Sequence, residues 1–567
     1  MTTHTLDLRF VAVACTLLAL VLPLSARGGQ GLGLAESACL AQVNPGDEVE
    51  GNTKACARGK ALMGATAVAV SADGKNVYVA SSGSDALVSF GRSGALGDLT
   101  ELGCTSNNGT TGLDGTKGSC ADGDVLRGAT AIAMSPDAKS VYVAAYASSG
   151  IAVFARDAVT GKLTQTGCVR PVSTCVGAGG LGGATSIVVS PDGKNVYVAS
   201  YNADATVSFA RDTVTGALKG LGCLSDDGND RQCGSGNALR GPNALVISPD
   251  GRFVYVAASE SNSVLTFERD PLTGTLTQRG CQLDSAPRNG SCVAATALMT
   301  PAALALAPDG RTLFVASYDS NAIAVFARDQ STGKLTQRGC LSDVTYLDEP
   351  DSKDGCVHTT PLASPTALAV SPDGRRLYVT VDSGFTVLDR DATSGGLRLA
   401  GCATYSDYYN DDDTKDCVVA KGLAGTAGLT VSPDGRNLYI AASSSNAVST
   451  FTPAASVFAR RLGKRGLLAV HVQCPMELES ACAGRLTLTQ TRGALAAAQP
   501  KAFSVAPGGS TVLFLKLKQT LLASATHGGR VKLLLAATDR QRRNAPVVQR
   551  VYLGNHAGRS TRWPHGR

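Results

Sequence analysis

The chain has 567 residues, of which 44% are hydrophobic, so it is too long for one simple domain and can bury a sizeable core. Aromatic residues make up 5%, charged residues 17%, and glycine occurs 64 times, a composition typical of short strands joined by turns. The formal net charge of +6 is spread unevenly. Residues 28–455 are acidic and lack the basic and aromatic interleaving of a nucleic-acid surface, which argues against specific nucleic-acid binding.

Residues 1–26 have the pattern of a signal peptide. Arg9 precedes an apolar run from Phe10 to Leu24, and Leu24-Ser25-Ala26 offers small residues for cleavage. This run is short for a bilayer span, and no later segment reaches the roughly 18 apolar residues that a transmembrane helix needs. We therefore expect a protein that is secreted or held in the cell envelope, with no transmembrane segment after cleavage.

Residues 31–455 contain seven near-copies of the sequence Ser-Pro-Asp-Gly-Lys-Asn-Val-Tyr-Val-Ala-Ser. In the third copy, alternating runs predict strands at Ala184–Ser190, Asn195–Ser200, Thr206–Arg211 and Ala217–Cys223, with tight turns between them. Four antiparallel strands in each of seven copies predict an all-β fold, a seven-bladed β-propeller. The turn aspartates of the seven copies are Asp73, Asp137, Asp192, Asp250, Asp309, Asp373 and Asp434.

The ends of the repeat region predict how the ring closes. The seventh copy runs from Gly428 to Phe451 and stops after three strands. The missing outer strand appears at the other end of the region, where Leu32 to Leu40 carries Cys39 in the outer-strand position. We expect this N-terminal strand to complete the last blade and to leave no open sheet edge.

Cysteine spacing predicts disulfides. Of 17 cysteines, Cys15 lies in the signal peptide, and the even number that remains occupies repeating positions in an exported chain. Metal binding would need Cys-x-x-Cys clusters or nearby histidines, and the sequence has neither. The expected pairs are Cys39–Cys56, Cys104–Cys120, Cys168–Cys175, Cys223–Cys233, Cys281–Cys292, Cys340–Cys356, Cys402–Cys417 and Cys474–Cys482.

The repeat resembles the lactonase-type and YVTN-type seven-bladed propellers of bacteria. The matching text is SPDGKNVYVAS, followed by Ala-Val-Phe-Ala-Arg-Asp and Thr-Gly-Lys-Leu-Thr at residues 152–157 and 160–164, and again at 324–329 and 332–336. The resemblance implies a propeller fold. For activity it implies a lactone hydrolase of the 6-phosphogluconolactonase kind, working with His, Arg and acidic side chains in the central cavity.

Residues 456–567 differ in character, with 18 Lys and Arg against three acidic residues. Strand-like runs at Leu467–Val472, Arg485–Gln490, Val512–Leu517, Val531–Ala537 and Val547–Leu553 predict a small β-sandwich with a flexible C-terminal end. The region resembles Ig-like domains of secreted bacterial proteins. Its charge has two open interpretations: adhesion to an anionic cell-wall polymer or membrane surface, or a solubilising surface.

Positions where the copies disagree are the candidates for a binding site. Arg127 and Arg240 stand just before the inner strands of two copies and are expected at the mouth of the central channel, where they could clamp an anion or pair with acidic loops. Polar residues on the inner strands lie beside them. These are Thr66, Thr130, Thr185, Asn243 and Thr366.

Two further features have both a functional and a structural interpretation. His358 is the only histidine of the propeller region and is either a general base or an exposed loop residue. An acidic loop either binds Ca²⁺ or is simply solvated, and no other cofactor is predicted. Its residues are Asp407, Asp411, Asp412, Asp413 and Asp416.

Nucleophile-elbow, zinc-protease and phosphate-loop motifs are absent from the sequence. The leading hypothesis is therefore a binding or scaffold propeller that takes a small anionic ligand or a protein on the loop face. One alternative is a lactonase that uses Arg127, Arg240 and His358. Another is a cell-wall adhesion protein anchored by its basic tail.

Overall fold

The computed structural model describes sixteen segments of the chain. They are residues 34–42, 56–93, 96–111, 118–171, 175–226, 232–284, 292–343, 355–405, 417–453, 456–462, 467–474, 481–490, 497–506, 509–518, 531–539 and 547–553. The expected signal peptide and the proposed calcium-binding aspartates at 407–416 lie outside these residues. The described segments form strands and no helix, so none of them offers a helix that could cross a membrane.

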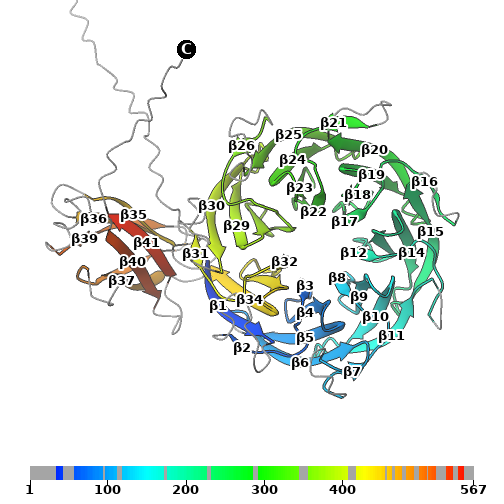
Figure 1. Ribbon diagram of the computed structural model, residues 1–567, viewed down its shortest axis with the longest axis horizontal. Helices are drawn as coiled ribbons and strands as arrows, with labels where there is room; N and C mark the ends of the chain where they lie inside the picture. Colours follow the sequence, from blue (N-terminus) through cyan, green and yellow to red (C-terminus); the bar gives the residue numbers. More distant parts are fainter. Residues whose placement is uncertain are drawn as a thin grey trace, which may run out of the picture.

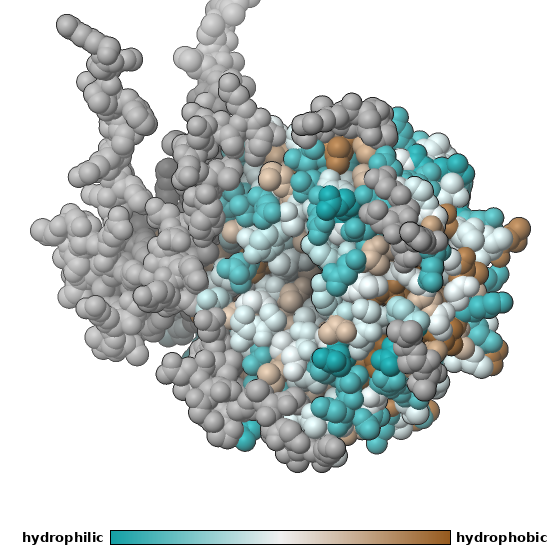
Figure 2. Space-filling model, turned by 45° about the vertical axis from the view of Figure 1, so that its right-hand side comes forward, coloured by the Kyte–Doolittle hydropathy of each residue, from teal (hydrophilic) through white to brown (hydrophobic). Residues whose placement is uncertain are grey.

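Seven β-sheets stand around a central axis and form a closed ring, which confirms the predicted seven-bladed propeller (Figure 1). The first strand of each blade lies nearest the axis, and neighbouring first strands such as those of blades 3 and 4 contact each other. The space-filling view shows the ring hollowed at its centre, with hydrophilic residues and residues of intermediate hydropathy around the hollow (Figure 2).

The strands of the first four blades follow the repeat closely. Blade 1 contains β3 (Ala65–Val70), β4 (Asn76–Ser81), β5 (Ala86–Ser93), β6 (Asp98–Ser106) and β7 (Ala121–Asp122). Blade 2 contains β8 (Ala129–Met134), β9 (Ser140–Ala145), β10 (Gly150–Arg156) and β11 (Leu163–Val169). Blade 3 contains β12 (Ala184–Val189), β13 (Asn195–Ser200), β14 (Ala205–Arg211), β15 (Leu218–Asp226) and β16 (Gly234–Gly236). Blade 4 contains β17 (Pro242–Ile247), β18 (Phe253–Ala258), β19 (Ser263–Arg269), β20 (Leu276–Asp284) and β21 (Val293–Ala295).

The remaining blades include the one that closes the ring. Blade 5 contains β22 (Pro301–Leu306), β23 (Thr312–Ser317), β24 (Ala322–Arg328), β25 (Leu335–Ser342) and β26 (Val357–His358). Blade 6 contains β27 (Ala367–Val370), β28 (Arg376–Val381), β29 (Gly384–Arg390), β30 (Leu397–Thr404) and β31 (Val418–Val419). Blade 7 contains β32 (Thr426–Val431), β33 (Leu438–Ala442), β34 (Ala447–Pro453), β1 (Leu34–Ala41) and β2 (Ala57–Arg58). β1 pairs antiparallel with β34, which confirms closure by the N-terminal strand.

The second strand of each blade is buried on both faces because neighbouring blades pack against it. All six residues of β13 are buried, although its sequence NVYVAS contains two polar residues. Tyr142 of blade 2 belongs to the same buried cluster as Val196 and Phe209 of blade 3. The hydrophobic core therefore lies between the blades and is divided around the ring.

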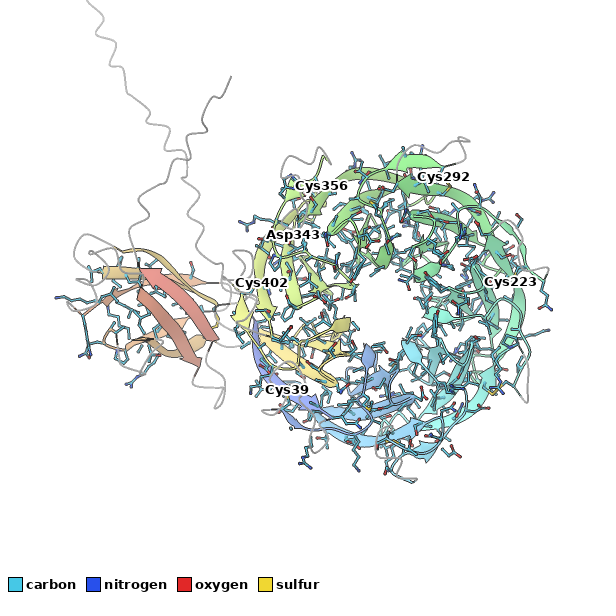
Figure 3. All side chains as sticks on the ribbon, viewed as in Figure 1. Cys39, Cys223, Cys292, Asp343, Cys356 and Cys402 are labelled. Atoms are coloured by element: carbon cyan, nitrogen blue, oxygen red, sulfur yellow. A yellow bond between two sulfur atoms is a disulfide. The ribbon has the colours of Figure 1, made fainter. Side chains whose placement is uncertain are left out.

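A short fifth strand follows the second cysteine of six repeats and was not predicted. It pairs parallel with the outer strand, as Thr105 does with Ala121, and in blade 2 a single bridge between Val169 and Val176 replaces it. The seven propeller disulfides join these two segments, and the labelled cysteines lie along the outer circumference (Figure 3). Each disulfide thus fixes a segment that is too short to be stable as a strand by itself.

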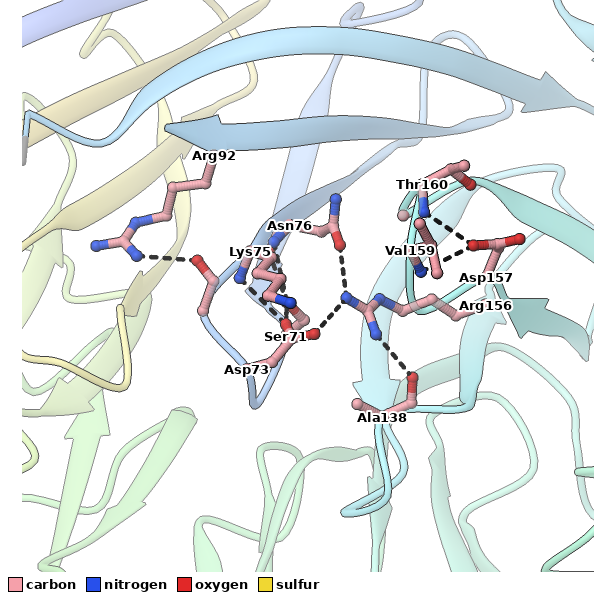
Figure 4. Close-up of polar contacts among 12 residues, drawn as sticks. Ser71, Asp73, Lys75, Asn76, Arg92, Ala138, Arg156, Asp157, Val159 and Thr160 are labelled. Carbon is pink, nitrogen blue, oxygen red and sulfur yellow. Dashed lines mark hydrogen bonds and ion pairs between the residues drawn. The ribbon is translucent and has the colours of Figure 1, made fainter. Parts of the chain in front are cut away.

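An arginine of the third strand connects each of six blades to the blade before it. Arg156 of blade 2 donates hydrogen bonds to Asn76 Oδ1 at 2.6 Å and to the Asp73 carboxylate at 2.8 Å, both in blade 1 (Figure 4). It also donates to Tyr78 Oη of blade 1 at 2.9 Å. Tyr78 in turn donates to the Gly161 carbonyl of blade 2 at 3.0 Å. We call this set the inter-blade latch. Its arginines are Arg92, Arg156, Arg211, Arg269, Arg328 and Arg390.

The interface between blades 6 and 7 has no such latch among the described residues. Pro453 occupies the position at the end of the third strand where the other blades carry arginine. The Asp373 carboxylate of blade 6 accepts hydrogen bonds from the Ser371 hydroxyl and the Arg375 amide of its own turn. This interface is therefore held without a buried arginine.

The C-terminal region forms two further sheets. One contains β35 (Ser456–Leu462), β36 (Leu467–Gln473) and β39 (Ser510–Lys516). The other contains β37 (Cys482–Gln490), β38 (Lys501–Val505), β40 (Val531–Asp539) and β41 (Val547–Leu553). Residues of both sheets share one buried cluster, and the Cys474–Cys482 disulfide is present. A two-sheet arrangement is thus found, while kinship with Ig-like domains stays a prediction.

Candidate functional site

Two sets of loops lie at the same end of the ring, which we call the mouth face. One set joins the second and third strands of a blade (2–3 loops), and the other joins the outer strand to the next blade (inter-blade loops). The Arg240 amide donates to the Ser261 hydroxyl at 2.9 Å, and the Ser261 amide donates to the Arg240 carbonyl at 3.2 Å. Arg127 is held in the same way by Ser148 of blade 2. Both arginines therefore lie on the mouth face, with blade 3 between them; their predicted position at the mouth of the central channel stays a prediction.

Arg240 and Glu260 form an exposed ion pair at the mouth of blade 4. The guanidinium Nη2 lies 3.3 Å from the Glu260 carboxylate, and the two side chains are 59% and 39% exposed. Gly241, with φ of 61°, brings the backbone close to Glu260, because a Cβ there would lie 2.8 Å from Glu260 Cγ. The pair is thus accessible to a ligand and is held against a turn that favours glycine.

Tyrosines of blades 2 and 3 extend this polar group along the mouth. A hydrogen bond with Glu260, together with partial burial, raises the pKa of Tyr201 above its usual value. Tyr146 donates a hydrogen bond to Asn202 Oδ1 at 2.9 Å. We call these five residues the mouth cluster: Tyr146, Tyr201, Asn202, Arg240 and Glu260.

Blade 5 adds similar chemistry next to this cluster. Thr300 donates a short hydrogen bond to the Asp319 carboxylate, and Tyr318 and Met299 are 41% and 47% exposed. A carboxylate, a guanidinium, phenol rings and an amide therefore meet solvent along blades 2 to 5. Such a mixture of flat apolar faces and hydrogen-bonding groups suits a small polar ligand.

The other predicted mouth residues have different surroundings. Among the described residues, Arg127 makes no ion pair, and its side chain is exposed. The hydroxyls of four predicted threonines donate to a backbone carbonyl of the next blade, for example Thr66 to Ala129 at 2.8 Å and Thr185 to Pro242 at 3.0 Å. Thr130 and Thr366 do the same, and Asn243 occupies the equivalent place in blade 4. These hydroxyl protons are therefore used to connect inner strands.

His358 lies on a different part of its blade from Arg127 and Arg240, which stand just before inner strands. It belongs to β26, the outermost strand of blade 5, on the circumference of the ring (Figure 1). Its Nδ1 lies 3.2 Å from the Ser342 hydroxyl. The structure thus does not bring His358 together with Arg127 and Arg240.

Metal binding finds no support within the described residues. One group there has metal-like spacing, formed by Asp124, Cys168 and Cys175. The two cysteines are joined to each other in a disulfide, so they have no thiolate to offer. The aspartates proposed for Ca²⁺ are outside the described residues, so this proposal stays a prediction.

Tyr146, Tyr201 and Glu260 were not predicted, because the seven copies were compared with each other only at the inter-blade position. A second varying position follows the second strand of each blade, and it would have pointed to the same side of the ring. Its residues in chain order are Ser82, Tyr146, Tyr201, Ser259, Tyr318, Asp382 and Ser443.

The opposite face carries repeated charged residues that have a structural role. Partial burial alone would raise the pKa of Asp73, but hydrogen bonds from Ser71, the Lys75 amide and Arg156 outweigh it and lower the pKa below its usual value. Burial raises the pKa of Tyr78 to about 12. Because the same set recurs around the ring, it stabilises the frame and is not a localised site.

Comparison with known proteins agrees with this architecture. The family described as "Lactonase, 7-bladed beta-propeller" matches residues 44–177, 127–295 and 293–346, which together make up more than half of the chain. The chain belongs to this family. A 6-phosphogluconolactonase of Formosa agariphila is 34% identical over 95 residues, 16% of this chain and 24% of that protein. The chain therefore aligns with about a quarter of this relative's length.

Solved structures with similar propellers share little sequence with this chain. The periplasmic gluconolactonase PpgL of Pseudomonas aeruginosa is 21% identical, with 59% of this chain and 84% of that chain covered and a TM-score of 0.42. A putative 6-phosphogluconolactonase of Bacteroides uniformis is also 21% identical, with 59% and 82% covered and a TM-score of 0.41.

Proposed function

We propose that this propeller hydrolyses a lactone of a polyhydroxylated acid at the mouth cluster. Membership of the lactonase family supports the reaction class. The observation that carries the proposal is the exposed pair of Arg240 and Glu260, with a tyrosine hydroxyl hydrogen-bonded to the same carboxylate. Among the described charged residues at the mouth, this group combines a general base, Glu260, with a cation that can stabilise an oxyanion, Arg240.

The residues have complementary roles in this reaction. The Glu260 carboxylate accepts a proton from the water that attacks the lactone carbonyl, and it returns this proton to the ring oxygen as the acyl C–O bond breaks, so that a hydroxy acid is released and the base is regenerated. The Arg240 guanidinium stabilises the oxyanion that forms, and it binds the carboxylate of the opened product. Tyr201 orients Glu260 through their hydrogen bond, and the exposed ring of Tyr146 offers a flat face for the sugar-derived carbons. His358 has no part in this mechanism.

Binding without turnover is the second candidate function. It is favoured by the ion pair itself, because Arg240 and Glu260 already neutralise each other in the absence of a ligand. In that case the same five residues would hold a sugar acid through its carboxylate and hydroxyls. The two candidates share a site and differ only in whether product appears.

A lactone panel separates these functions. Purified full-length protein is incubated with glucono-δ-lactone and with γ-butyrolactone, and acid release is followed with a pH indicator. We expect hydrolysis of the hydroxylated lactone, and a loss of about 100-fold or more in kcat for Glu260→Gln. Arg240→Gln is expected to raise KM and lower kcat together.

A matched ion pair elsewhere on the chain provides the control. Arg279 and Glu268 lie 2.8 Å apart on blade 4 and are 54% and 35% exposed, and neither is in the mouth cluster. Glu268→Gln should keep the wild-type rate. Absence of turnover, with gluconate binding that Arg240→Gln abolishes, would replace the hydrolase by the binding function. Wild-type rates in Glu260→Gln would refute the assigned base.

The disulfides bear on where this reaction takes place. Eight disulfides in the described residues indicate an oxidising compartment. Export through residues 1–26 would deliver the chain to such a compartment. Fractionation of cells that express the full chain tests this, and reduced cytoplasmic protein with free thiols would contradict it.

A further inference from the structure

Three aliphatic side chains protrude from the face opposite the mouth. Val159, Val214 and Leu272 are 93%, 85% and 95% exposed. They occupy the same position in three consecutive blades, at the tip of the turn that joins the third and fourth strands. Blades 5 and 6 carry Ser331 and Thr393 at this position. The apolar tips are therefore confined to blades 2 to 4 and do not belong to the repeat as such.

The turns hold these tips in one conformation. The Asp157 carboxylate accepts hydrogen bonds from the Val159 and Thr160 amides, both at 2.8 Å (Figure 4). Asp212 and Asp270 bind the amides of Val214 and Leu272 in the same way. A rigid turn presents an apolar side chain without a further loss of conformational entropy when it binds.

Basic residues lie on the same face as the tips. Each Ser-Pro-Asp-Gly turn carries a lysine or arginine two residues after its aspartate, on the same face: Lys75, Lys139, Lys194, Arg252, Arg311, Arg375 and Arg436. Six of the seven turn aspartates pair with the arginines of the inter-blade latch. Asp373 and the five capping aspartates of the outer turns are the six that remain, against these seven basic residues. This face is therefore more basic than residues 28–455 as a whole, which carry 32 basic and 42 acidic residues.

A shallow depression joins the apolar and the basic groups. It has a volume of about 480 Å³ between blades 3 and 4, and its lining includes Lys194, Arg211, Asp212, Val214, Pro271 and Leu272. An ammonium group thus lies beside two exposed aliphatic side chains. Aliphatic tips flanked by cations fit the interface of an anionic bilayer, where phosphates lie just above the acyl chains.

We propose that this face docks on an anionic lipid surface, with Val159, Val214 and Leu272 entering the interface and the turn cations binding headgroup phosphates. The mouth face then points away from the bilayer and stays open to a soluble ligand. The docking is independent of the reaction proposed for the mouth cluster, since no residue is shared.

Vesicle binding by the full-length protein tests this. Large vesicles of phosphatidylethanolamine and phosphatidylglycerol are compared with pure phosphatidylcholine vesicles in a sedimentation assay. The combined variant Val159→Ser, Val214→Ser and Leu272→Ser should lower the partition coefficient about tenfold or more. A matched variant removes three other exposed aliphatics and should bind as the wild type does: Val176→Ser, Val293→Ser and Val357→Ser, at positions 50%, 55% and 68% exposed.

A fluorescent probe separates this docking from attraction of the basic C-terminal region to the same lipids. The chain has a single tryptophan, Trp563, so Leu272→Trp in a Trp563→Phe background reports on the tip alone. We expect a blue shift and quenching by brominated lipid, and neither for Val357→Trp in that background. Vesicle binding without a change at the tip would overturn the proposal. So would absence of binding, or tips that prove to mediate association between copies of the chain.

Discussion

Replacing Arg156 by alanine should strongly destabilise the propeller. Its side chain is 1% exposed, and the guanidinium makes four hydrogen bonds, to Tyr78, Ala138, Asp73 and Asn76. At about 1 kcal/mol each, these bonds are worth about 4 kcal/mol. Asp73 keeps its bonds to Ser71 and the Lys75 amide, and Tyr78 keeps its bond to Gly161. The expected loss in the free energy of unfolding is therefore about 3 kcal/mol, near the lower end for breaking a buried pair.

Urea unfolding of the oxidised protein, followed by circular dichroism, measures this loss. Arg279→Ala is the matched control, because its 2.8 Å contact with Glu268 equals the Arg156–Asp73 distance while the arginine is 54% exposed. The control should lose less than about 1 kcal/mol. If both variants lose the same amount, burial does not decide the strength of these pairs and the latch has no special role. Since Arg156 lies on the face opposite the mouth, lactone hydrolysis should survive the substitution.

Three further outcomes follow from the same contacts. Asp250→Asn weakens a latch whose arginine is fully buried and should cost about 2 kcal/mol, whereas Asp373→Asn, at the interface without a latch, should cost less than about 1 kcal/mol in the same urea assay. The latch aspartates have lowered pKa values, so the stability that they supply is present above about pH 4 and is lost in more acidic solution. Tyrosines such as Tyr255, with a pKa raised to about 12, supply stability that is lost as the pH rises from 10 towards 12. Thermal melts in acidic solution below about pH 4 and in alkaline solution from pH 10 to 12 measure the two effects separately. Replacing Cys39 and Cys56 together by serine opens a loop of 17 residues on the closing strand and should cost about 3 kcal/mol; an unchanged melting temperature would contradict the loop-entropy reasoning.

Local sequence patterns were sufficient for the frame of this protein. Alternating strands and Asp-Gly turns predicted the blades, and Cys39 at the outer-strand position predicted that the N-terminal strand closes the ring. Both predictions depend on local strand and turn patterns that recur in the copies, so that each copy supports the same assignment. The cysteine pairs could be assigned for the same reason.

The candidate site depends on contacts between different copies. The threonines of the inner strands looked like free polar groups, yet Thr66 donates its proton to the carbonyl of Ala129, 63 residues away. His358 looked like a candidate base, and the unpredicted parallel strand β26 places it on the circumference. Neither outcome can be deduced from one copy, because the partners belong to another blade or to another strand.

The sequence by itself determined the number of blades, the closing strand and the disulfides, since these follow from period, turn chemistry and cysteine spacing. The tertiary structure decided which of the repeated polar residues are used inside the frame and which face solvent. Arg156 and Arg240 are both arginines of the propeller, but one is buried between two blades and the other is exposed beside Glu260. That difference arises from the packing of one blade on the next, which no local pattern contains.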